Sequence, residues 1–464
     1  MDVQGKTERF FAIREKAESV SESTALNRLE SFFDEDSFFE TEVFVRQRPT
    51  ESGFVAEAEG VVTGYGSVDG LLCYAFAQDP SVMGGSISEM HAKKICDLIE
   101  LAAKAEAPIV SFIDCGGIRA GEGMDALQGY ASVIAAFTRV AGICPHISVV
   151  CGNCTGAFSF VPAIADYTVM LKNASLFLTS PLVAKAVTGK ESSGTANDGF
   201  ASGYVSKVCE TEDECFESVR AFLSVIQDEE ESDDVNRLLP ELNSVLINDN
   251  YDVKEVIEAV ADNGNVIYVS DGNAQNVVTA LIKVGGMAIG VCANQPSVKN
   301  GALDSAAAKK LSKFIDFCDS YDLPILTFAD TEGFAPDSAE NIEDCATLVS
   351  AYSNADVPMV TVAIHKAFGS GYVSMCPKSA GADVYLAFTT AEIAPLTPEV
   401  GGLLFADGVF DGAPDPVAAR NSAIEKYREV ASSPLEAAKR GYVDDIIEPM
   451  TVRQLIISSF NMFM

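Results

Sequence analysis

Apolar and polar positions alternate along the chain in a pattern that predicts strands joined by helices. Residues 71–76 form a short apolar run, residues 87–99 place apolar side chains on one helical face, and residues 109–113 form a second apolar run. Short continuous runs are typical of buried strands, whereas apolar spacings of three and four residues are typical of amphipathic helices. A strand, a helix and a strand in this order favour parallel pairing through a helical crossover. The pattern therefore predicts an α/β fold.

This pattern occurs twice. A shift of 216 positions places Gly117 on Gly333 and needs no gap over residues 70–117. With a three-residue adjustment, Gly156 falls on Gly369. A register held through two strands, a helix and a later glycine turn indicates an internal repeat, which is a feature to establish before any single motif is interpreted.

An acidic run at residues 227–234 separates two halves of nearly equal length. It contains no residues suited to a core, and runs of this kind are typical of solvated linkers. We therefore predict two homologous domains, at residues 1–230 and 240–464.

Glycine-rich turns follow the predicted buried strands in both halves. The strand at residues 147–151 precedes a turn with Gly156 and Ala157, and residues 367–372 are its counterpart. A turn that leads into a helix aims backbone N–H groups at one point, which can hold an anion or the oxyanion of an enolate. The alternative is that the glycines only allow strand and helix to pack closely. Because the turn occurs at matching positions in both halves, we favour the oxyanion interpretation.

The net charge narrows the function classes. With 32 Lys and Arg against 67 Asp and Glu, the chain carries a formal charge of −35, which argues against nucleic-acid or anionic-membrane binding. The 12 cysteines are scattered, and the first forty residues do not resemble a secretion signal. We expect a reduced, cytoplasmic protein.

Other candidate sites have weaker support. Cys151 and Cys154 form a C-x-x-C pair without a second pair, so zinc is disfavoured and a redox role is a minor alternative. Asp114 and Asp330 end equivalent strands, where we expect each to cap the following turn. No nucleophile motif or metal site is predicted, and three histidines are interpreted as structural: His91, His146 and His365.

Several motifs, taken in order, resemble those of one enzyme family. The chain is similar to the carboxyltransferase subunits of biotin-dependent acyl-CoA carboxylases and decarboxylases, of the methylmalonyl-CoA decarboxylase alpha and propionyl-CoA carboxylase beta type. These subunits hold two homologous domains of the crotonase-like superfamily. The motifs that carry the resemblance lie at residues 26–30, 36–38, 60–66, 84–91, 114–123, 293–304, 366–369, 381–383, 390–392 and 433–445.

The resemblance implies roles for both turns. Gly156 and Ala157 would hold the thioester oxygen of acyl-CoA while its α-carbon becomes an enolate, and the loop at Gly116 and Gly117 would line the acyl-CoA site. In the second half, a catalytic and biotin-binding turn would hold the ureido oxygen of biotin, with Val373 beside it: Gly369, Ser370 and Gly371. In this family the proton is taken by the cofactor, so no side-chain base is expected.

The resemblance also implies partners. Neither a biotinyl-lysine loop nor an ATP-binding carboxylase domain is recognisable, so biotin would come on a separate carrier protein. The resemblance further implies a biotin carboxylase or a membrane sodium-pump subunit as a partner. In this family the amino-terminal domain of one subunit meets the carboxy-terminal domain of another, in a hexamer built from dimers.

Departures from the family keep alternatives open. Ala157 and Ser370 replace glycines that are common in the family, and Glu332 stands where proline is frequent. Val373 falls where carboxylases often carry aspartate, which favours a decarboxylase acting on a dicarboxylyl-CoA such as methylmalonyl-CoA. The alternatives are the carboxyltransferase of an acetyl- or propionyl-CoA carboxylase, and a catalytically weakened scaffold paralogue.

Overall fold

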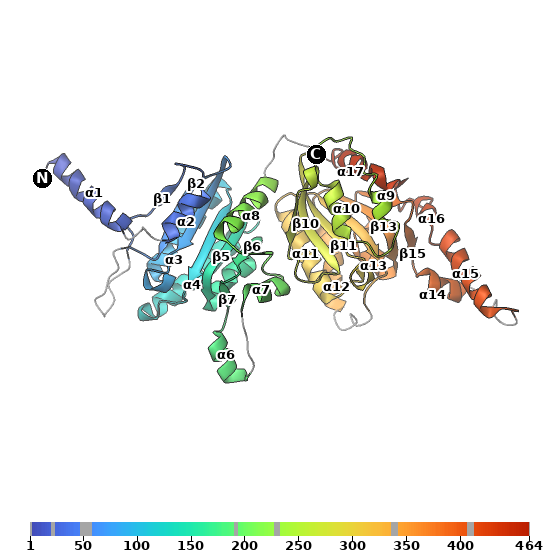
Figure 1. The fold of residues 1–464 in the computed structure, drawn as a ribbon, viewed down its shortest axis with the longest axis horizontal. Coiled ribbons are helices and arrows are strands. Elements are labelled where there is room, and N and C mark those ends of the chain that lie inside the picture. Colours follow the sequence, from blue (N-terminus) through green and yellow to red (C-terminus); the bar gives the residue numbers. More distant parts are fainter. Residues whose placement is uncertain are drawn as a thin grey trace. The chain divides into compact units, whose positions relative to one another are not determined.

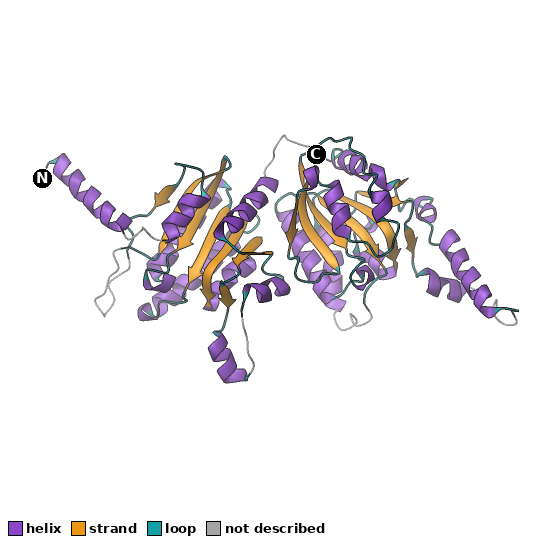
Figure 2. Cartoon of the chain, in the orientation of Figure 1, coloured by secondary structure: helices purple, strands orange, loops and turns teal. Residues whose placement is uncertain are grey.

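The computed structural model describes residues 2–19, 24–46, 58–189, 194–226, 233–335, 342–405 and 413–463. The chain forms two compact units, Met1–Ser224 and Val225–Met464, each built on one mixed sheet with helices against it (Figures 1 and 2). Most of the acidic run expected as a linker, residues 227–232, lies outside the described residues.

The sheet of the first unit has the strand order β1-β2-β3-β4-β5-β6-β8, with β7 paired to β5. The strands from β3 onward run parallel, whereas β1, β2 and β3 pair antiparallel. The strands are β1 Phe39–Thr41, β2 Val61–Val68, β3 Leu71–Gln78, β4 Ile109–Cys115, β5 His146–Thr155, β6 Tyr167–Leu171, β7 Ser175–Phe177 and β8 Lys207–Cys209. The helices are α1 Val3–Ser19, α2 Thr24–Phe32, α3 Glu89–Ala105, α4 Met124–Val140, α5 Phe160–Ile164, α6 Pro181–Thr188, α7 Ala196–Ser202 and α8 Glu212–Val225.

The second unit repeats this topology, with the order β9-β10-β11-β12-β13-β14-β16 and β15 paired to β13. The strands are β9 Val266–Val269, β10 Val277–Val284, β11 Met287–Asn294, β12 Ile325–Thr331, β13 Met359–Phe368, β14 Val384–Phe388, β15 Glu392–Ala394 and β16 Asp445–Ile447. The helices are α9 Leu242–Val245, α10 Val253–Val260, α11 Ser305–Ser320, α12 Ile342–Asn354, α13 Gly369–Ser374, α14 Pro398–Phe405, α15 Pro416–Val430, α16 Pro434–Ala438 and α17 Val452–Phe460.

The repeat seen in the sequence is a repeat of structure. β3 and β11 begin and end 216 positions apart, as do β4 and β12, and β5 and β13 are offset by 213 positions. These are the two offsets that the sequence comparison indicated. The α/β fold with two homologous halves is therefore confirmed.

Each sheet is buried on both faces. In the first unit, Phe112 of β4 packs edge-on against Phe32 of α2 and Phe216 of α8. On the opposite face, Phe137 of α4 stacks on His146 of β5 at 3.9 Å between ring centroids. Because successive residues of a strand point to opposite faces, this double burial explains why the central strands read as continuous apolar runs.

One strand boundary differs from the prediction. The strand was predicted to end at residue 151, but β5 continues through Gly152 to Thr155. A Cβ at this position would lie 2.3 Å from the carboxylate carbon of Asp114 on the neighbouring strand. Glycine is needed here because a side chain of β4 packs against the backbone of β5, and not because the chain turns.

Candidate active site

In the first unit, the two glycine segments singled out in the sequence lie next to each other. β4 and β5 run parallel, Cys115 pairs with Cys154, and both strands end at the same edge of the sheet. A Cβ added to Gly117, which has a φ of +106°, would lie 3.0 Å from the Thr155 hydroxyl that precedes Gly156. The structure therefore brings the 116–117 loop against the turn at Gly156 and Ala157.

The turn itself has open space around it. Gly156 has a φ of +68° and begins a short 3₁₀ helix, Gly156–Ser159, that leads into α5. A Cβ at Gly156 would meet a single atom within 4 Å, the hydroxyl oxygen of Tyr130 at 3.9 Å. The first N–H groups of a helix have no partner within it, so this turn is able to donate to a bound oxygen.

The second unit repeats the arrangement. β13 ends at Phe368 and α13 begins at Gly369, which has a φ of +49°. A Cβ at Gly371 would lie 2.9 Å from the Cα of Gly333, so the loop after β12 packs against this turn as well. Ser370 is exposed, whereas Gly371 is buried against the loop.

A cavity of about 810 Å³ opens beside the second turn. Gly369 and Val373, two of the four residues that the resemblance implies for biotin binding, line this cavity, and Val373 is half-exposed. The other two, Ser370 and Gly371, are not among its lining residues. Its other walls come from α13, α15, α16, β15 and the residues that follow these last three elements: Tyr372, Ile393, Ala394, Pro395, Val430, Ala431, Glu436, Ala437, Arg440 and Tyr442.

Comparison with known proteins agrees with this geometry. The model of the carboxyl transferase domain matches residues 17–464. The chain belongs to the carboxyl transferase family. The resemblance seen in the sequence, and the enzyme class with it, are therefore confirmed.

Individual relatives match nearly the whole carboxyltransferase chain. Methylmalonyl-CoA decarboxylase subunit alpha of Propionigenium modestum is 38% identical over 97% of this chain and 91% of that protein. The methylmalonyl-CoA carboxyltransferase 12S subunit of Propionibacterium freudenreichii subsp. shermanii is 36% identical, over 97% of this chain and 90% of that protein. A crystal structure of transcarboxylase 12S, described as a hexamer assembly with methylmalonyl-coenzyme A and methylmalonic acid bound, superposes with a TM-score of 0.93. It is 34% identical and covers 100% of this chain and 96% of that one.

Sequence reasoning missed most of the cavity wall of this carboxyltransferase. Arg440 and Tyr442 lie in a family motif, but nothing local indicated that they face the turn at Gly369. The guanidinium of Arg440 lies 2.8 Å from the carboxylate of Glu436, and Lys439 binds the same carboxylate. Hydrogen bonds from these two cations lower the pKa of Glu436. The wall thus carries a carboxylate that is paired with two exposed cations.

The two aspartates do not cap turns, which corrects the prediction. Each sits at a bulge between the paired strands, and its Oδ1 accepts a hydrogen bond from a main-chain N–H of the next strand. Asp114 accepts from Asn153 at 3.1 Å, and Asp330 accepts from Lys366 at 3.1 Å. Both therefore fix the strand ends from which the turns start.

The histidines are buried in this carboxyltransferase. Burial lowers the pKa of His146 to about 3. Burial, with the charges of Arg119 and Lys94, also holds the pKa of His91 well below its usual value. Burial alone would lower the pKa of His365, but its hydrogen bond and charge interaction with Asp330 raise it. None of these rings faces the turn at Gly156 or the cavity beside Gly369 in the contacts described.

The remaining candidates have no evident chemical role. Cys151 and Cys154 are both buried thiols on β5, and burial raises the pKa of Cys151 to about 12. Within the described ranges, no cluster of three or more His, Cys, Asp or Glu side chains has an arrangement that could hold a metal ion. In the same ranges, no helix combines the length and apolar character needed to cross a membrane. Glu332 is exposed and lies 3.3 Å from Lys366, which offsets the charge it adds beside the second turn.

Proposed function

We propose that this chain moves a carboxyl group between a dicarboxylyl-CoA, such as methylmalonyl-CoA, and biotin held on a separate carrier protein, in the decarboxylase direction. The observation that carries the proposal is the pair of turns at Gly156 and Gly369, each packed beside a glycine loop from the neighbouring strand. Carboxyl transfer requires two oxyanions to be stabilised, one on each reactant. One N–H donor aimed at such an oxygen is typically worth about 3 to 4 kcal/mol.

In the first unit, the N–H groups at Gly156 and Ala157 hold the thioester oxygen while the α-carbon gains or loses the carboxyl group. The loop at Gly116 and Gly117 forms the adjoining wall. The methyl group of Ala157 narrows the space for the acyl chain. Relatives named for methylmalonyl-CoA support this choice of acyl group.

In the second unit, the turn at Gly369, Ser370 and Gly371 holds the ureido oxygen. The cavity of about 810 Å³ beside it has mostly apolar walls and is within the usual size range for a small-molecule site, so the residues present fit a small bicyclic ring. Biotin, when bound, would supply the ring nitrogen that accepts the carboxyl group in the decarboxylase direction, and the proton that this nitrogen loses would replace the carboxyl group on the α-carbon. The apolar side chain of Val373, which lines this cavity, supports the decarboxylase direction.

The carrier, a biotin carboxylase or sodium-pump partner, a hexameric assembly and the cytoplasmic location are parts of the same proposal. A structural neighbour described as a hexamer supports the assembly. The runner-up is the same transfer in a propionyl-CoA carboxylase, favoured by a relative of that name in Haloferax mediterranei.

The test is a substrate panel. The purified protein is incubated with methylmalonyl-, malonyl- or glutaconyl-CoA and with free biotin or a biotinylated carrier, and loss of each thioester is followed chromatographically. We expect biotin-dependent loss of methylmalonyl-CoA. No loss of any substrate by the folded protein with a working carrier would refute the proposal and favour the scaffold alternative.

A further inference from the structure

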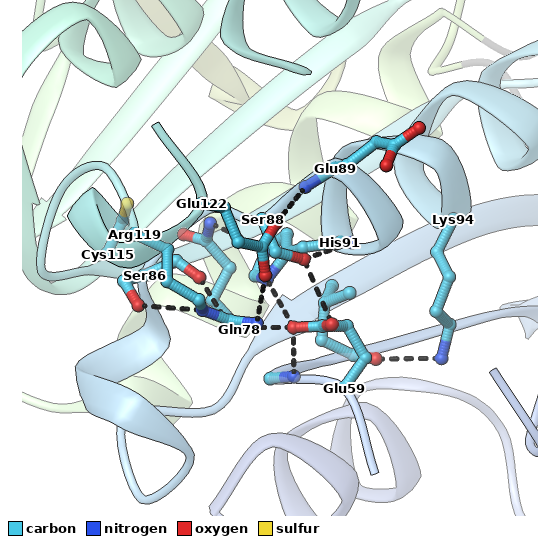
Figure 3. Close-up of polar contacts among 12 residues, drawn as sticks. Glu59, Gln78, Ser86, Ser88, Glu89, His91, Lys94, Cys115, Arg119 and Glu122 are labelled. Carbon is cyan, nitrogen blue, oxygen red and sulfur yellow. Dashed lines mark hydrogen bonds and ion pairs between the residues drawn. The ribbon is translucent and has the colours of Figure 1, made fainter. Parts of the chain in front are cut away.

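A buried group of charged and polar side chains adjoins the 116–117 loop in the first unit, and no step of the proposed reaction uses it (Figure 3). At its centre, the guanidinium of Arg119 lies 2.6 Å from the carboxylate of Glu59, and both side chains are at most 2% exposed. Charged residues are rarely buried this completely.

This ion pair connects three segments. Arg119 donates to the carbonyl oxygen of Ser86 at 2.8 Å. Glu59 accepts a hydrogen bond of 2.9 Å from the hydroxyl of Ser88, which in turn caps the first turn of α3. The start of β2, the start of α3 and the segment after the 116–117 loop are thus held together.

The main chain of the loop is part of the same connection. Ile87 donates its N–H to the carbonyl oxygen of Gly117 at 2.9 Å, and Arg119 donates its N–H to the carbonyl oxygen of Ile87 at 2.9 Å. Gly116 donates to the carbonyl oxygen of Gly84 at 2.8 Å. Any movement of the Arg119 side chain therefore acts on the loop through the residue's own backbone.

The second unit makes the same main-chain bridge without the ion pair. Leu303 donates to Gly333, and Ala335 donates to Leu303, at 2.9 and 2.7 Å. Gln275 and Ala335 occupy the positions of Glu59 and Arg119 at the offset of 216. The carbonyl oxygen of Ala302, equivalent to that of Ser86, accepts a hydrogen bond of 2.7 Å from the neutral amide of Asn276.

The second unit shows that the fold does not need this buried ion pair. Burying an ion pair costs desolvation that its attraction often fails to repay, and neutral replacements are often equally stable. A buried pair of this kind is therefore not expected to add much to the stability of the fold. It is better suited to holding the segments that it joins in one geometry.

We propose that Glu59 and Arg119 are positioning residues. Their ion pair, which the equivalent positions of the second unit lack, holds the 116–117 loop of the first unit in the geometry that acyl-CoA requires. The proposal rests on the proposed function, in which this loop lines the acyl-CoA site.

The test compares Arg119→Lys with a matched control, Arg453→Lys. Arg453 is fully buried in the second unit, and its guanidinium lies 2.6 Å from the carboxylate of Asp262. Both variants therefore keep a positive charge and lose the planar guanidinium with its several N–H donors. We expect kcat/KM for methylmalonyl-CoA to fall about 100-fold in Arg119→Lys, the size of effect that a misplacement of about 1 Å can have. The KM for free biotin stays unchanged. Arg453→Lys loses stability without this selective effect.

A second readout does not depend on turnover. Amide hydrogen exchange in Arg119→Lys is expected to accelerate at residues 87, 116 and 119, and to stay unchanged at residues 303 and 335. The proposal would be overturned if Arg119→Lys changed neither the exchange rates nor the kinetics. It would also be overturned if Arg119→Lys and Arg453→Lys lost kcat/KM for methylmalonyl-CoA equally, in proportion to their folded fractions. If the wild-type protein turns over no substrate, the proposed function fails, and exchange still decides whether the pair holds the loop.

A neutral variant covers the case in which Arg119→Lys does not fold. The triple variant Glu59→Gln, Gly60→Asn, Arg119→Ala introduces the residues that the second unit carries at these positions, so both charges of the pair are removed together. Glu122, whose carboxylate lies 3.6 Å from Arg119, keeps its hydrogen bond from the main-chain N–H of Glu89. We expect it to fold and to show the same selective loss for methylmalonyl-CoA. Wild-type kinetics in the folded triple variant would overturn the proposal.

Discussion

Replacing Gly156 by alanine tests the first turn directly, because Gly70 offers a matched control in the same unit. Both glycines have a positive φ, +68° and +84°. A Cβ at Gly70 would meet no atom within 4 Å, and one at Gly156 would meet only the Tyr130 hydroxyl at 3.9 Å. Neither substitution causes a clash, and both place alanine at a positive φ, so the two variants share the same kind of backbone strain.

The expected magnitudes separate stability from catalysis. A left-handed conformation costs a non-glycine residue about 1 to 2 kcal/mol, so both variants should lose about that much unfolding free energy. Relief of this strain at residue 156 turns the N–H groups away from the thioester oxygen. Loss of one such donor lowers kcat about 100- to 1000-fold. Gly70→Ala has no such donor to lose.

The assay is biotin-dependent turnover of methylmalonyl-CoA by each variant, with urea unfolding measured on the same preparations. We expect equal losses of stability and a loss of kcat in Gly156→Ala alone. A Gly156→Ala protein that is folded and retains kcat within about threefold, well short of the loss expected for a missing oxyanion donor, would refute the assignment of this turn.

Three further predictions follow from the remaining contacts. Asp330 raises the pKa of His365. The stability from their interaction is therefore fully present below the unfolded histidine pKa of about 6.5 and is lost as pH rises through the folded pKa. Urea unfolding between pH 5 and 9 should show this decline in stability, and the decline should be smaller in a His365→Gln variant. Gly152→Ala would place a Cβ 2.3 Å from the Asp114 carboxylate carbon and should lower stability by about 1 to 3 kcal/mol, seen as a lower melting temperature; an unchanged melting temperature would contradict the packing. Val373→Trp adds bulk to a side chain that lines the cavity and should raise the KM for free biotin while leaving the KM for methylmalonyl-CoA unchanged; a rise in the latter alone would argue against the biotin assignment.

The sequence contained enough to predict the fold and the position of both turns. Buried parallel strands read as apolar runs because both faces of each sheet are covered, and the repeat supplied a second copy of each signal. The bounds of β4 and β12 reproduce the offset of 216 read from the sequence. These features are local or periodic, so one chain is enough to see them.

Features that depend on distant partners could not be predicted. Asp114 was predicted to cap a turn. Its carboxylate instead accepts a hydrogen bond from Asn153, 39 residues away, at a bulge between strands, and neither feature leaves a local pattern in the sequence. The ion pair of Glu59 and Arg119 joins residues 60 positions apart without any local pattern. Arg440 lines the same cavity as Gly369 because α16, which ends shortly before Arg440, packs against β15.

The most direct test of the central claim follows the carboxyl group itself. The protein is mixed with methylmalonyl-CoA labelled in its free carboxyl carbon and with a biotinylated carrier, and the label is located after the two are separated. The account predicts that label leaves the thioester and appears on the carrier, with propionyl-CoA formed in equal amount. Label that stays on the thioester, or that is released without any need for biotin, would contradict the account.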